Sequence, residues 1–499
     1  MHARSSIVSG VRFTTAAIAH RRGKRNQAAV VVGLVAFAIS LAGSWIPSYW
    51  SDEVATLRAS RLSWLELFSF VEHKDAVHVA YYSVMKVWVS GFGESELATR
   101  SVSALAVGAA AGGLVILAST MTLRVGVLAG VIFAVLPRTT AMGIEARSFA
   151  LSAAFAVWIT VVLLVAVRAQ GWRWWALYAF GVAAGTYFFL YSVLILAAHI
   201  VFLLLDHRAR AVLMSWLLAA SAAVAMTVPI IVISVQQREQ IAWLSELPVV
   251  TVWTVLGKPV FDSSWLVAAI AWCALLILAI RCRTIWSGLH GSSFRLAAAW
   301  LSVPVVLLLA ADIVVGPLYT ARYLSFIVPA AAVLLAVSFT LASRASISWL
   351  LVCVVALASA PTYVVQRGPF AKDAGSDLAE IADYIHSNAR AGDGIYLQDT
   401  GRSTLRPRLA LYAYPEAFTD TDDIAFKAPF TSTGTFSDQT RSLDEIEPRL
   451  AALNRFWVIT AGSPDSAIAQ ETGEAVHMMG LFEAKLHTTN RSTIVLYER

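Results

Sequence analysis

The sequence predicts a polytopic α-helical membrane protein with a C-terminal soluble α/β domain, and three observations support this fold class. Of the 499 residues, 58% are hydrophobic and only 14% are charged, whereas soluble domains have about 25% charged residues. Apolar runs of roughly 20 residues, the length that spans a bilayer, recur as far as residue 367. Beyond that point, short segments with helix or strand periodicity follow one another.

The charge balance changes at the same point. Up to Arg367 the chain has 26 Lys and Arg against 13 Asp and Glu, and from residue 368 onward it has 12 against 19. The basic residues of the first part lie in short loops between apolar runs, a distribution that sets membrane topology and does not indicate nucleic-acid binding. We therefore expect a cytoplasmic segment 1–27, a transmembrane catalytic domain 28–367 and an extracytoplasmic α/β domain 368–499.

Eleven apolar runs are predicted to be transmembrane helices. They cover about residues 28–47, 99–120, 125–141, 148–167, 174–189, 190–205, 211–234, 263–280, 295–313, 323–342 and 347–366. The basic stretch before the first run predicts a signal anchor with a cytoplasmic N-terminus, in a multi-pass protein of the plasma membrane. With this orientation, Asp206 is the one acidic residue before position 368 that falls on the cytoplasmic side. That asymmetry suggests chemistry on the outer face.

The first extracytoplasmic loop, about residues 48–98, is the largest of the membrane domain. Its segments "SWLELFSFVEH" and "YYSVMKVWVSGFG" have helical spacing, and we expect helices that lie in the membrane interface. In the C-terminal domain, "SDLAEIADYIHSN" predicts a helix with Ser376 as its N-cap, and "GDGIYLQ" predicts a strand. "LDEIEPRLAAL" and "RFWVITA" repeat this order, and "LFEAKLHT" and "STIVLYER" predict a final strand pair. The domain has no cysteine, since Cys273, Cys282 and Cys353 all precede it.

Asp52 and Glu53 follow the first apolar run directly, in "PSYWSDEVATL". One explanation is a helix start, with Ser51 as N-cap and two carboxylates in the first turn. The other is catalysis, because ionisable groups at the membrane boundary are costly and often functional. Neighbouring residues do not share a helix face, so the pair cannot readily flank one bond as glycosidase carboxylates do. One carboxylate could instead act as general base while the other orients a substrate or a side chain.

The segment "HKDAVHVAYY" contains Lys74, Asp75, His78, Tyr81 and Tyr82. It is either a solvated interfacial loop or a cradle for a sugar or phosphate, since its side chains supply both donors and acceptors. Asp75 and His78, three residues apart, could also hold a divalent metal.

Two arginines lie at the ends of predicted helices, Arg147 in "GIEARSFAL" and Arg322 in "GPLYTARYLSFIVP". Arg147 either pairs with Glu145 or binds an anionic phosphate, and Arg322 is either an interfacial anchor or a phosphate ligand. No cytoplasmic loop is long enough to bind a nucleotide sugar. An enzyme that works on the outer face therefore needs a membrane-borne donor.

The acidic pair, "DAVHVAYY", "GESELATRSVSALAVG", "LPRTTAMGIEARSFAL" and "ARYLSFIVPA" occur in an order that resembles the GT-C glycosyltransferase superfamily. The branch is similar to the protein O-mannosyltransferase and aminoarabinose-transferase group, in its actinobacterial mannosyltransferase form. The resemblance covers about residues 28–345 and depends on order and topology. Val79 and Ala80 stand where the family's "HPPLYY"-like segment has prolines, which puts the course of this loop in question.

The resemblance implies an enzyme that moves a sugar, mannose in the nearest branch, from a polyprenyl-phosphate donor to an acceptor hydroxyl with inversion. Asp52 would be the catalytic base, Glu53 would shape the acceptor or sugar site, and Arg147 and Arg322 would lie near the donor phosphate. The acceptor would be a glycolipid such as lipoarabinomannan, a polysaccharide or a protein of the cell envelope. The alternative is a transporter or flippase of lipid-linked sugar, although such proteins usually contain internal repeats and none is detectable here.

Overall fold

The computed structural model describes residues 3–207, 209–246, 249–281, 291–341 and 344–499, so Cys282 lies outside the described residues. The chain forms two compact units. The helical unit consists of Met1–Ala42 and Arg100–Tyr363, and the loop–sheet unit consists of Gly43–Thr99 and Val364–Arg499. The sequence-based division assigned residues 48–98 to the membrane domain. The structure packs them with the C-terminal domain instead, because Tyr49, Val54 and Leu57 belong to that domain's hydrophobic core.

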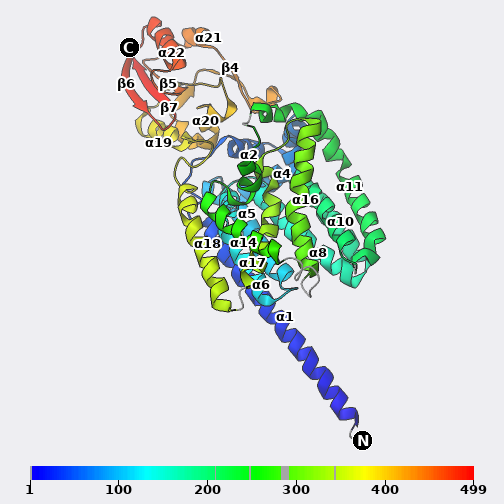
Figure 1. Ribbon diagram of the computed structural model, residues 1–499. Helices are drawn as coiled ribbons and strands as arrows, with labels where there is room; N and C mark the ends of the chain where they lie inside the picture. The colour runs from blue at the N-terminus through cyan, green and yellow to red at the C-terminus, as the bar shows by residue number, and fades with distance from the viewer. Residues whose placement is uncertain (1–2, 208, 247–248, 282–290, 342–343) are drawn as a thin grey trace. The chain divides into compact units, whose positions relative to one another are not determined.

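Each of the eleven predicted runs contains a helix (Figure 1). The helices of these runs are α1 (Ala3–Leu41), α5 (Glu96–Ala118), α6 (Leu123–Val135), α8 (Phe149–Ala169), α9 (Trp172–Phe188), α10 (Ile195–Leu205), α11 (Leu213–Gln236), α14 (Trp265–Ile280), α16 (Gly291–Val315), α17 (Val328–Thr340) and α18 (Ala345–Val365). Shorter elements between them are α7 (Pro137–Met142), η2 (Leu190–Leu194), η3 (Ala209–Val212), η4 (Arg238–Glu246), α12 (Val252–Leu256), α13 (Lys258–Phe261) and η5 (Ala321–Ile327). Within the described residues, seven helices are long and apolar enough to cross a membrane. The chain is thus a polytopic α-helical membrane protein, as predicted.

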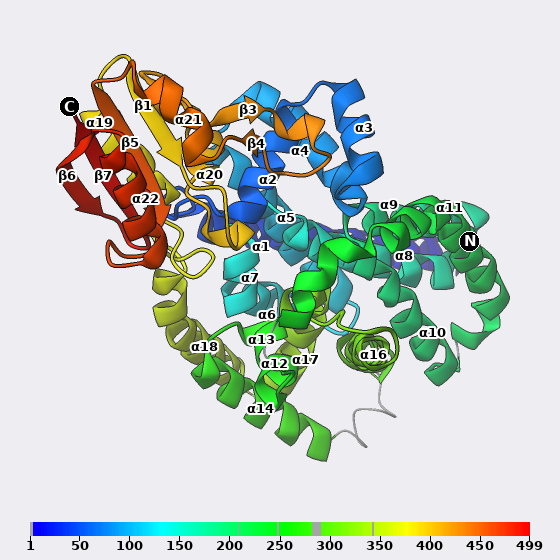
Figure 2. The same cartoon turned by 90° about the horizontal axis from the view of Figure 1, so that it is seen from above.

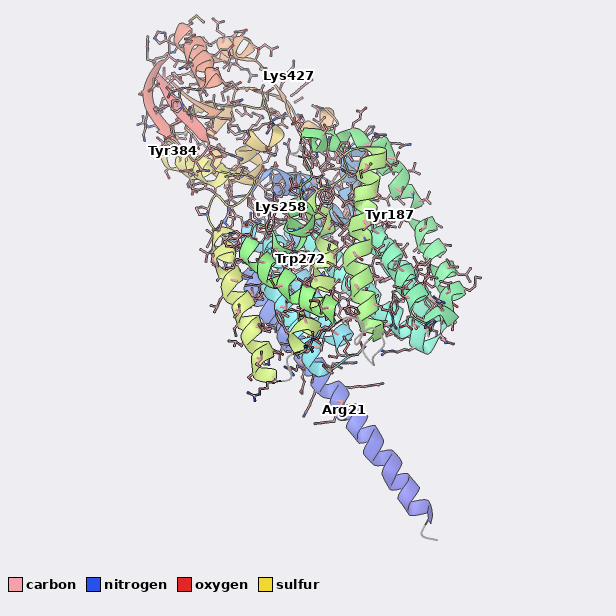
Figure 3. All side chains as sticks on the ribbon, viewed as in Figure 1. Arg21, Tyr187, Lys258, Trp272, Tyr384 and Lys427 are labelled. Atoms are coloured by element: carbon pink, nitrogen blue, oxygen red, sulfur yellow. The ribbon has the colours of Figure 1, made fainter. Side chains whose placement is uncertain are left out.

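The basic residues that precede the first apolar run lie on α1, which is continuous with that run. Arg21, Arg22 and Lys24 are exposed on this helix, and Figure 3 shows Arg21 projecting from it.

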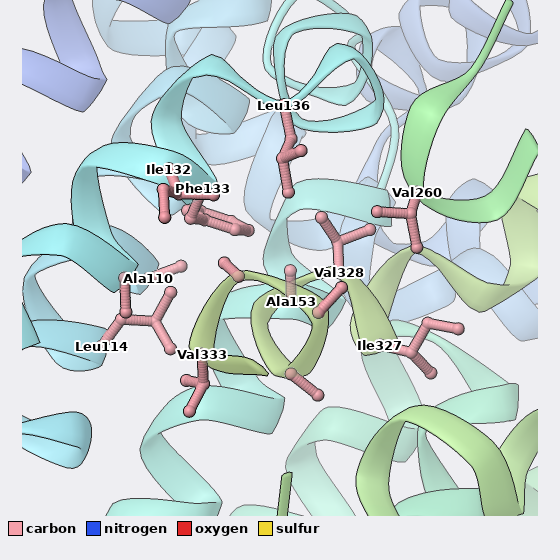
Figure 4. Packing of buried hydrophobic residues seen from close by; sticks show 14 of the residues in the cluster. Ala110, Leu114, Ile132, Phe133, Leu136, Ala153, Val260, Ile327, Val328 and Val333 are labelled. Carbon is pink, nitrogen blue, oxygen red and sulfur yellow. The ribbon is translucent and has the colours of Figure 1, made fainter. Parts of the chain in front are cut away.

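Helix α17 is the centre of the helical unit. Residues 328–339 of this helix are all buried, and Figure 4 shows side chains of α5, α6 and α8 gathered around it, among them Leu114, Phe133 and Ala153. Alanine occupies four of those twelve positions. Small residues allow close approach between helices, and van der Waals packing is what holds helices together inside a bilayer.

Glycines bring α1 and α5 into backbone contact. A Cβ added to Gly33 would lie 2.9 Å from the carbonyl oxygen of Gly108, and one added to Gly112 would lie 2.9 Å from the carbonyl oxygen of Ala29. Real Cβ atoms are not found at such distances from a backbone oxygen. The two helices can therefore pack at this separation only if these positions lack a side chain.

A buried polar network joins α8, α9, α10 and α11. His199 is fully buried, with Nδ1 2.8 Å from the Tyr178 hydroxyl and Nε2 3.1 Å from the Thr160 hydroxyl. Trp216 donates to the Tyr178 hydroxyl at 3.0 Å, and the Thr160 hydroxyl donates to the carbonyl of Ala156. These directions require Tyr178 to donate to Nδ1 and Nε2 to donate to Thr160, which a neutral imidazole satisfies completely. The network therefore joins the four helices and leaves no donor or acceptor of the ring unused.

The loop–sheet unit has a five-stranded sheet of order β2-β1-β5-β7-β6. Figure 2 labels β1, β5, β7 and β6 of this sheet. The strands of the sheet are β1 (Asp393–Leu397), β2 (Thr421–Asp423), β5 (Arg455–Ala461), β6 (Phe482–Thr488) and β7 (Ser492–Glu498), and a small hairpin pairs β3 (Phe426–Ala428) with β4 (Gln439–Thr440). β2, β1 and β5 are parallel, whereas β7 is antiparallel to both β5 and β6. The predicted final strand pair is thus confirmed.

Helices cover both faces of this sheet. The helical elements of the unit are α2 (Ser51–Arg61), α3 (Trp64–His73), η1 (Ala76–His78), α4 (Val79–Phe92), α19 (Leu378–Asn388), η6 (Ser403–Leu405), α20 (Leu409–Ala413), η7 (Pro415–Phe418), η8 (Phe430–Ser432), α21 (Leu443–Leu450) and α22 (Ala467–Met478). Trp457 and Ile459 of β5 pack in one core with α2, α19 and α20. Phe456 and Val458 pack on the other face with α21 and α22. This alternation is the period of two that a strand imposes.

The predicted N-cap of α19 is wrong. Asp377 precedes the helix without a capping side-chain bond, and the Ser376 hydroxyl donates instead to the carbonyl oxygen of Tyr49 at 2.6 Å. The hydroxyl that the local pattern assigned to the helix end therefore bonds to a residue more than 300 positions away in sequence.

Replacing Gly112 with Ala should destabilise the helical unit, because its Cβ would press on the Ala29 carbonyl. Overpacking of this kind costs about 1–3 kcal/mol, measurable as a lower Tm of the detergent-solubilised protein. Gly91→Ala is the matched control, since a Cβ there meets nothing within 4 Å. An unchanged Tm in Gly112→Ala would contradict the close approach of α1 and α5.

Candidate functional site

Asp52 and Glu53 lie in the first turn of α2, and the helix separates them. Glu53 is 0% exposed, whereas Asp52 is half-exposed. Of the two carboxylates, that of Asp52 is therefore the one accessible to solvent.

Ser51 does not cap the start of α2, although the local sequence pattern allows it. Trp50 is the N-cap and makes no side-chain capping bond, and its carbonyl accepts the backbone N–H of Glu53 and of Val54 at 2.9 Å each. The Ser51 hydroxyl donates to the carboxylate of Asp373 at 3.2 Å. Ser51 is therefore a tether within the loop–sheet unit.

The segment from Lys74 to Tyr82 forms a tight turn between α3 and α4. Asp75 has a φ of 59°, in the left-handed region, and its carboxylate accepts a 2.8 Å hydrogen bond from the Tyr82 hydroxyl. The rings of His78 and Tyr82 lie 5.8 Å apart. The structure therefore brings Asp75, His78 and Tyr82 together, while Tyr81 is buried and Lys74, which ends α3, is half-exposed.

This turn does not make up a metal site by itself. The described part of the chain has no group of three His, Cys, Asp or Glu side chains placed to hold an ion. Asp75 and His78 supply two donors at most, and the carboxylate of Asp75 already receives the Tyr82 hydroxyl.

In the helical unit, Arg322 of η5 lies among aromatic rings. Its guanidinium carbon is 5.2 Å from the ring centre of Trp243 and 5.9 Å from that of Phe149. Arg147 is 7% exposed and lies two residues before Phe149. Aromatic faces attract a guanidinium and leave its N–H edge available for an anion.

Arg138 belongs to the same cluster, although the sequence analysis did not single it out. Its Nε donates to the Ser325 hydroxyl at 2.9 Å, and that hydroxyl donates to the carbonyl of Arg322 at 2.6 Å. Its guanidinium carbon is 5.3 Å from the ring centre of Phe149. The signal was present, because a cation in the apolar context "FAVLPRTTAMG" is costly and therefore a functional candidate.

The site residues thus fall into two sets. The loop–sheet unit has the acidic set and the Lys74–Tyr82 turn, and the helical unit has the arginine cluster of Arg138, Arg147 and Arg322.

No model of a known protein family matches the chain, and no curated protein matches it by sequence. Among solved structures, ArnT from Cupriavidus metallidurans bound to undecaprenyl phosphate aligns with a TM-score of 0.56 at 14% identity, over 94% of this chain and 97% of that one. Apo ArnT from the same organism aligns with a TM-score of 0.51 at 13% identity over the same shares.

The chain therefore shares the fold of these ArnT structures. The alignment extends over nearly the whole length of both chains. The C-terminal sheet, for which the sequence provided no family resemblance, is thus part of the likeness.

Replacing Glu53 with Ala should lower the Tm more than replacing Asp52 with Ala. Truncating a fully buried side chain leaves a cavity and removes buried polar contacts, which costs about 2–5 kcal/mol. Truncating a half-exposed carboxylate lets water fill the space. Equal losses of Tm at the two adjacent positions would contradict the assignment of Asp52 as the accessible group.

Proposed function

We propose that the protein is a membrane glycosyltransferase that moves a sugar from a polyprenyl-phosphate donor to an acceptor hydroxyl. The observation that carries the proposal is the fold shared with ArnT bound to undecaprenyl phosphate, over 94% of this chain. The arginine cluster and the half-exposed Asp52 support it, because the reaction needs cations for a phosphate and a base for a hydroxyl.

Asp52 is the general base in this mechanism. The acceptor oxygen forms a bond to the anomeric carbon of the sugar while its proton passes to the Asp52 carboxylate. The bond between the anomeric carbon and the phosphate oxygen breaks, and polyprenyl phosphate leaves with that electron pair. Attack from the side opposite the leaving group inverts the anomeric centre. A phosphate leaves without being protonated, so one base suffices and Glu53 has no acid-base role.

The arginine cluster stabilises the leaving phosphate. Arginine remains charged at all relevant pH values, and its planar N–H edge matches phosphate oxygens. The Arg138 guanidinium donates to the Ser325 hydroxyl and lies by the ring of Phe149. The Arg322 guanidinium lies by the rings of Phe149 and Trp243. Their orientation is therefore set before the donor binds, and Arg147, two residues before Phe149, adds a third positive charge.

The Lys74–Tyr82 turn contacts the sugar or the phosphate. Lys74 and His78 are half-exposed donors, and Tyr82 fixes the turn through its bond to Asp75. Tyr81 is buried beside them and shapes the wall of the turn.

The remaining assignments follow the sequence resemblance. We propose mannose as the donor sugar and the outer face of the plasma membrane as the place of reaction, with the N-terminus inside. The acceptor is a cell-envelope glycolipid of the lipoarabinomannan type, a polysaccharide or a protein.

Asp52→Asn should lower kcat for transfer by about 10²–10⁴-fold, because the general base is lost. The assay uses purified protein reconstituted with labelled polyprenyl-phosphate mannose and follows release of free polyprenyl phosphate. The control is the Tm, which this isosteric exchange at a half-exposed position should leave unchanged. Wild-type turnover in the variant would refute the role of Asp52. Movement of intact donor across the bilayer without release would instead identify a flippase.

Arg322→Met and Arg138→Met should raise the KM for the donor by roughly 10- to 100-fold, since a hydrogen bond between charged groups contributes about 1.5–3 kcal/mol. Arg173→Met is the matched control, because Arg173 is an exposed arginine beside a ring, that of Trp172, in the same unit. An equal effect of all three exchanges would point to a general change of charge and would contradict a phosphate site at Phe149.

A further inference from the structure

Arg58 lies on the same helix as Asp52, and its side chain is enclosed by the C-terminal domain. One terminal nitrogen donates to the Asp438 carboxylate at 2.9 Å and the other to the carbonyl of Phe436 at 2.6 Å. Its guanidinium carbon lies 3.6 Å from the ring centre of Tyr412 and 4.2 Å from that of Phe430. The side chain is 3% exposed, and these partners all belong to the C-terminal domain.

Asp438 is the centre of this arrangement. One of its oxygens accepts from Arg58 and from the backbone N–H of Phe430, and the other accepts from Arg408 Nε and the Tyr412 hydroxyl. The carboxylate is 0% exposed. Burial raises the pKa of Tyr412, which keeps its hydroxyl a donor. A buried carboxylate with four donors is stable only while all of them are in place.

The cluster lies at the carboxyl edge of the parallel strands. Arg408 forms a two-pronged ion pair with Asp423, the last residue of β2. Its backbone N–H donates to the carbonyl of Gln398, the residue that follows β1. This is the edge at which open α/β sheets bind their ligands. In this protein the side chain of Arg58, from α2, lies at that edge.

Residues 430–438 of the C-terminal domain, which include Phe436 and Asp438, also contact α3 and α4. The ring of Phe436 lies 4.8 Å from that of Phe70 in α3 and 6.4 Å from that of Tyr82 in α4. Phe430 lies 5.6 Å from Phe70. Residues 430–438, between β3 and β4, thus hold three consecutive helices of the first loop.

We infer that the C-terminal domain is a clamp that positions the catalytic helix α2, with Arg58 and Asp438 as its positioning residues. The inference rests on the proposed function, in which Asp52 is the base. An isolated helix of 11 residues is marginal in water, because isolated helices need about 12–15 residues. Tertiary contacts therefore fix where Asp52 lies. Displacement of a reacting group by about 1 Å can cost 10²-fold in rate.

Arg58→Met should loosen α2 and slow the chemical step. In the full-length protein we expect at least tenfold faster amide hydrogen exchange in residues 51–61. We also expect a 10- to 100-fold lower kcat with the KM for polyprenyl-phosphate mannose changed less than twofold. If Arg58→Met does not fold, Tyr412→Phe removes one donor to Asp438, keeps the ring under Arg58 and should shift both measurements in the same direction.

Arg455→Met is the matched control. Arg455 forms a partly buried ion pair with Asp393 and Glu498 in the same domain, and none of these residues belongs to the cluster around Asp438. This variant should leave exchange in α2 and kcat unchanged. A fall in kcat as large as that of Arg58→Met would overturn the inference, because general loosening of the domain would then explain both effects.

Two further outcomes distinguish failure of the inferred clamp from failure of the proposed function. Unchanged exchange of α2 in Arg58→Met would overturn the clamp and leave the assignment of Asp52 standing. Faster exchange with normal turnover would overturn the positioning role. If Asp52→Asn also retained normal turnover, the proposed function would fail too.

Discussion

The hydrophobic core that α2 shares with the C-terminal sheet is the constraint on which the loop–sheet unit depends. Tyr49, Val54 and Leu57 are each at most 1% exposed and pack with Ile381 and Trp457. Burying three such side chains stabilises the unit by several kcal/mol, at roughly 1.5–3 kcal/mol for each. The start of the first loop therefore packs into the core of a domain that follows more than 250 residues later.

Hydrophobic packing fixes α2 against the sheet without specifying its rotation and register, and polar contacts supply this precision. A buried arginine–carboxylate pair adds little net stability, because desolvation of the two charges offsets their attraction. The pair instead fixes the orientation of the Arg58 side chain, because two guanidinium N–H bonds and two neighbouring rings permit only one arrangement. The tie between Ser376 and Tyr49 adds a second fixed point at the start of the helix.

Features with a short period or a long apolar run were predictable from sequence. Bilayer-length runs predicted the seven helices that, among the described residues, are long and apolar enough to cross a membrane. Short strand-like segments predicted β5, β6 and β7. The N-cap predicted at Ser376 was wrong, and Ser51, one possible N-cap, is not one either, because both hydroxyls donate to groups that are remote in sequence. Arg58 and Asp438 lie 380 residues apart, and no local pattern relates them. Arg138 could have been identified from its apolar context, whereas its bond to Ser325 could not.

The placement of charges also explains how a base can share a helix with an arginine. An arginine next to a carboxylate favours the ionised form and makes that carboxylate a weaker base. Helical residues advance by about 100° each, so Arg58, six positions after Asp52, is turned by roughly 120° from it. Asp438 engages Arg58 on that other side, where Tyr412 and Phe430 enclose the guanidinium. The positive charge of Arg58 is therefore neutralised away from Asp52, which we propose as the base.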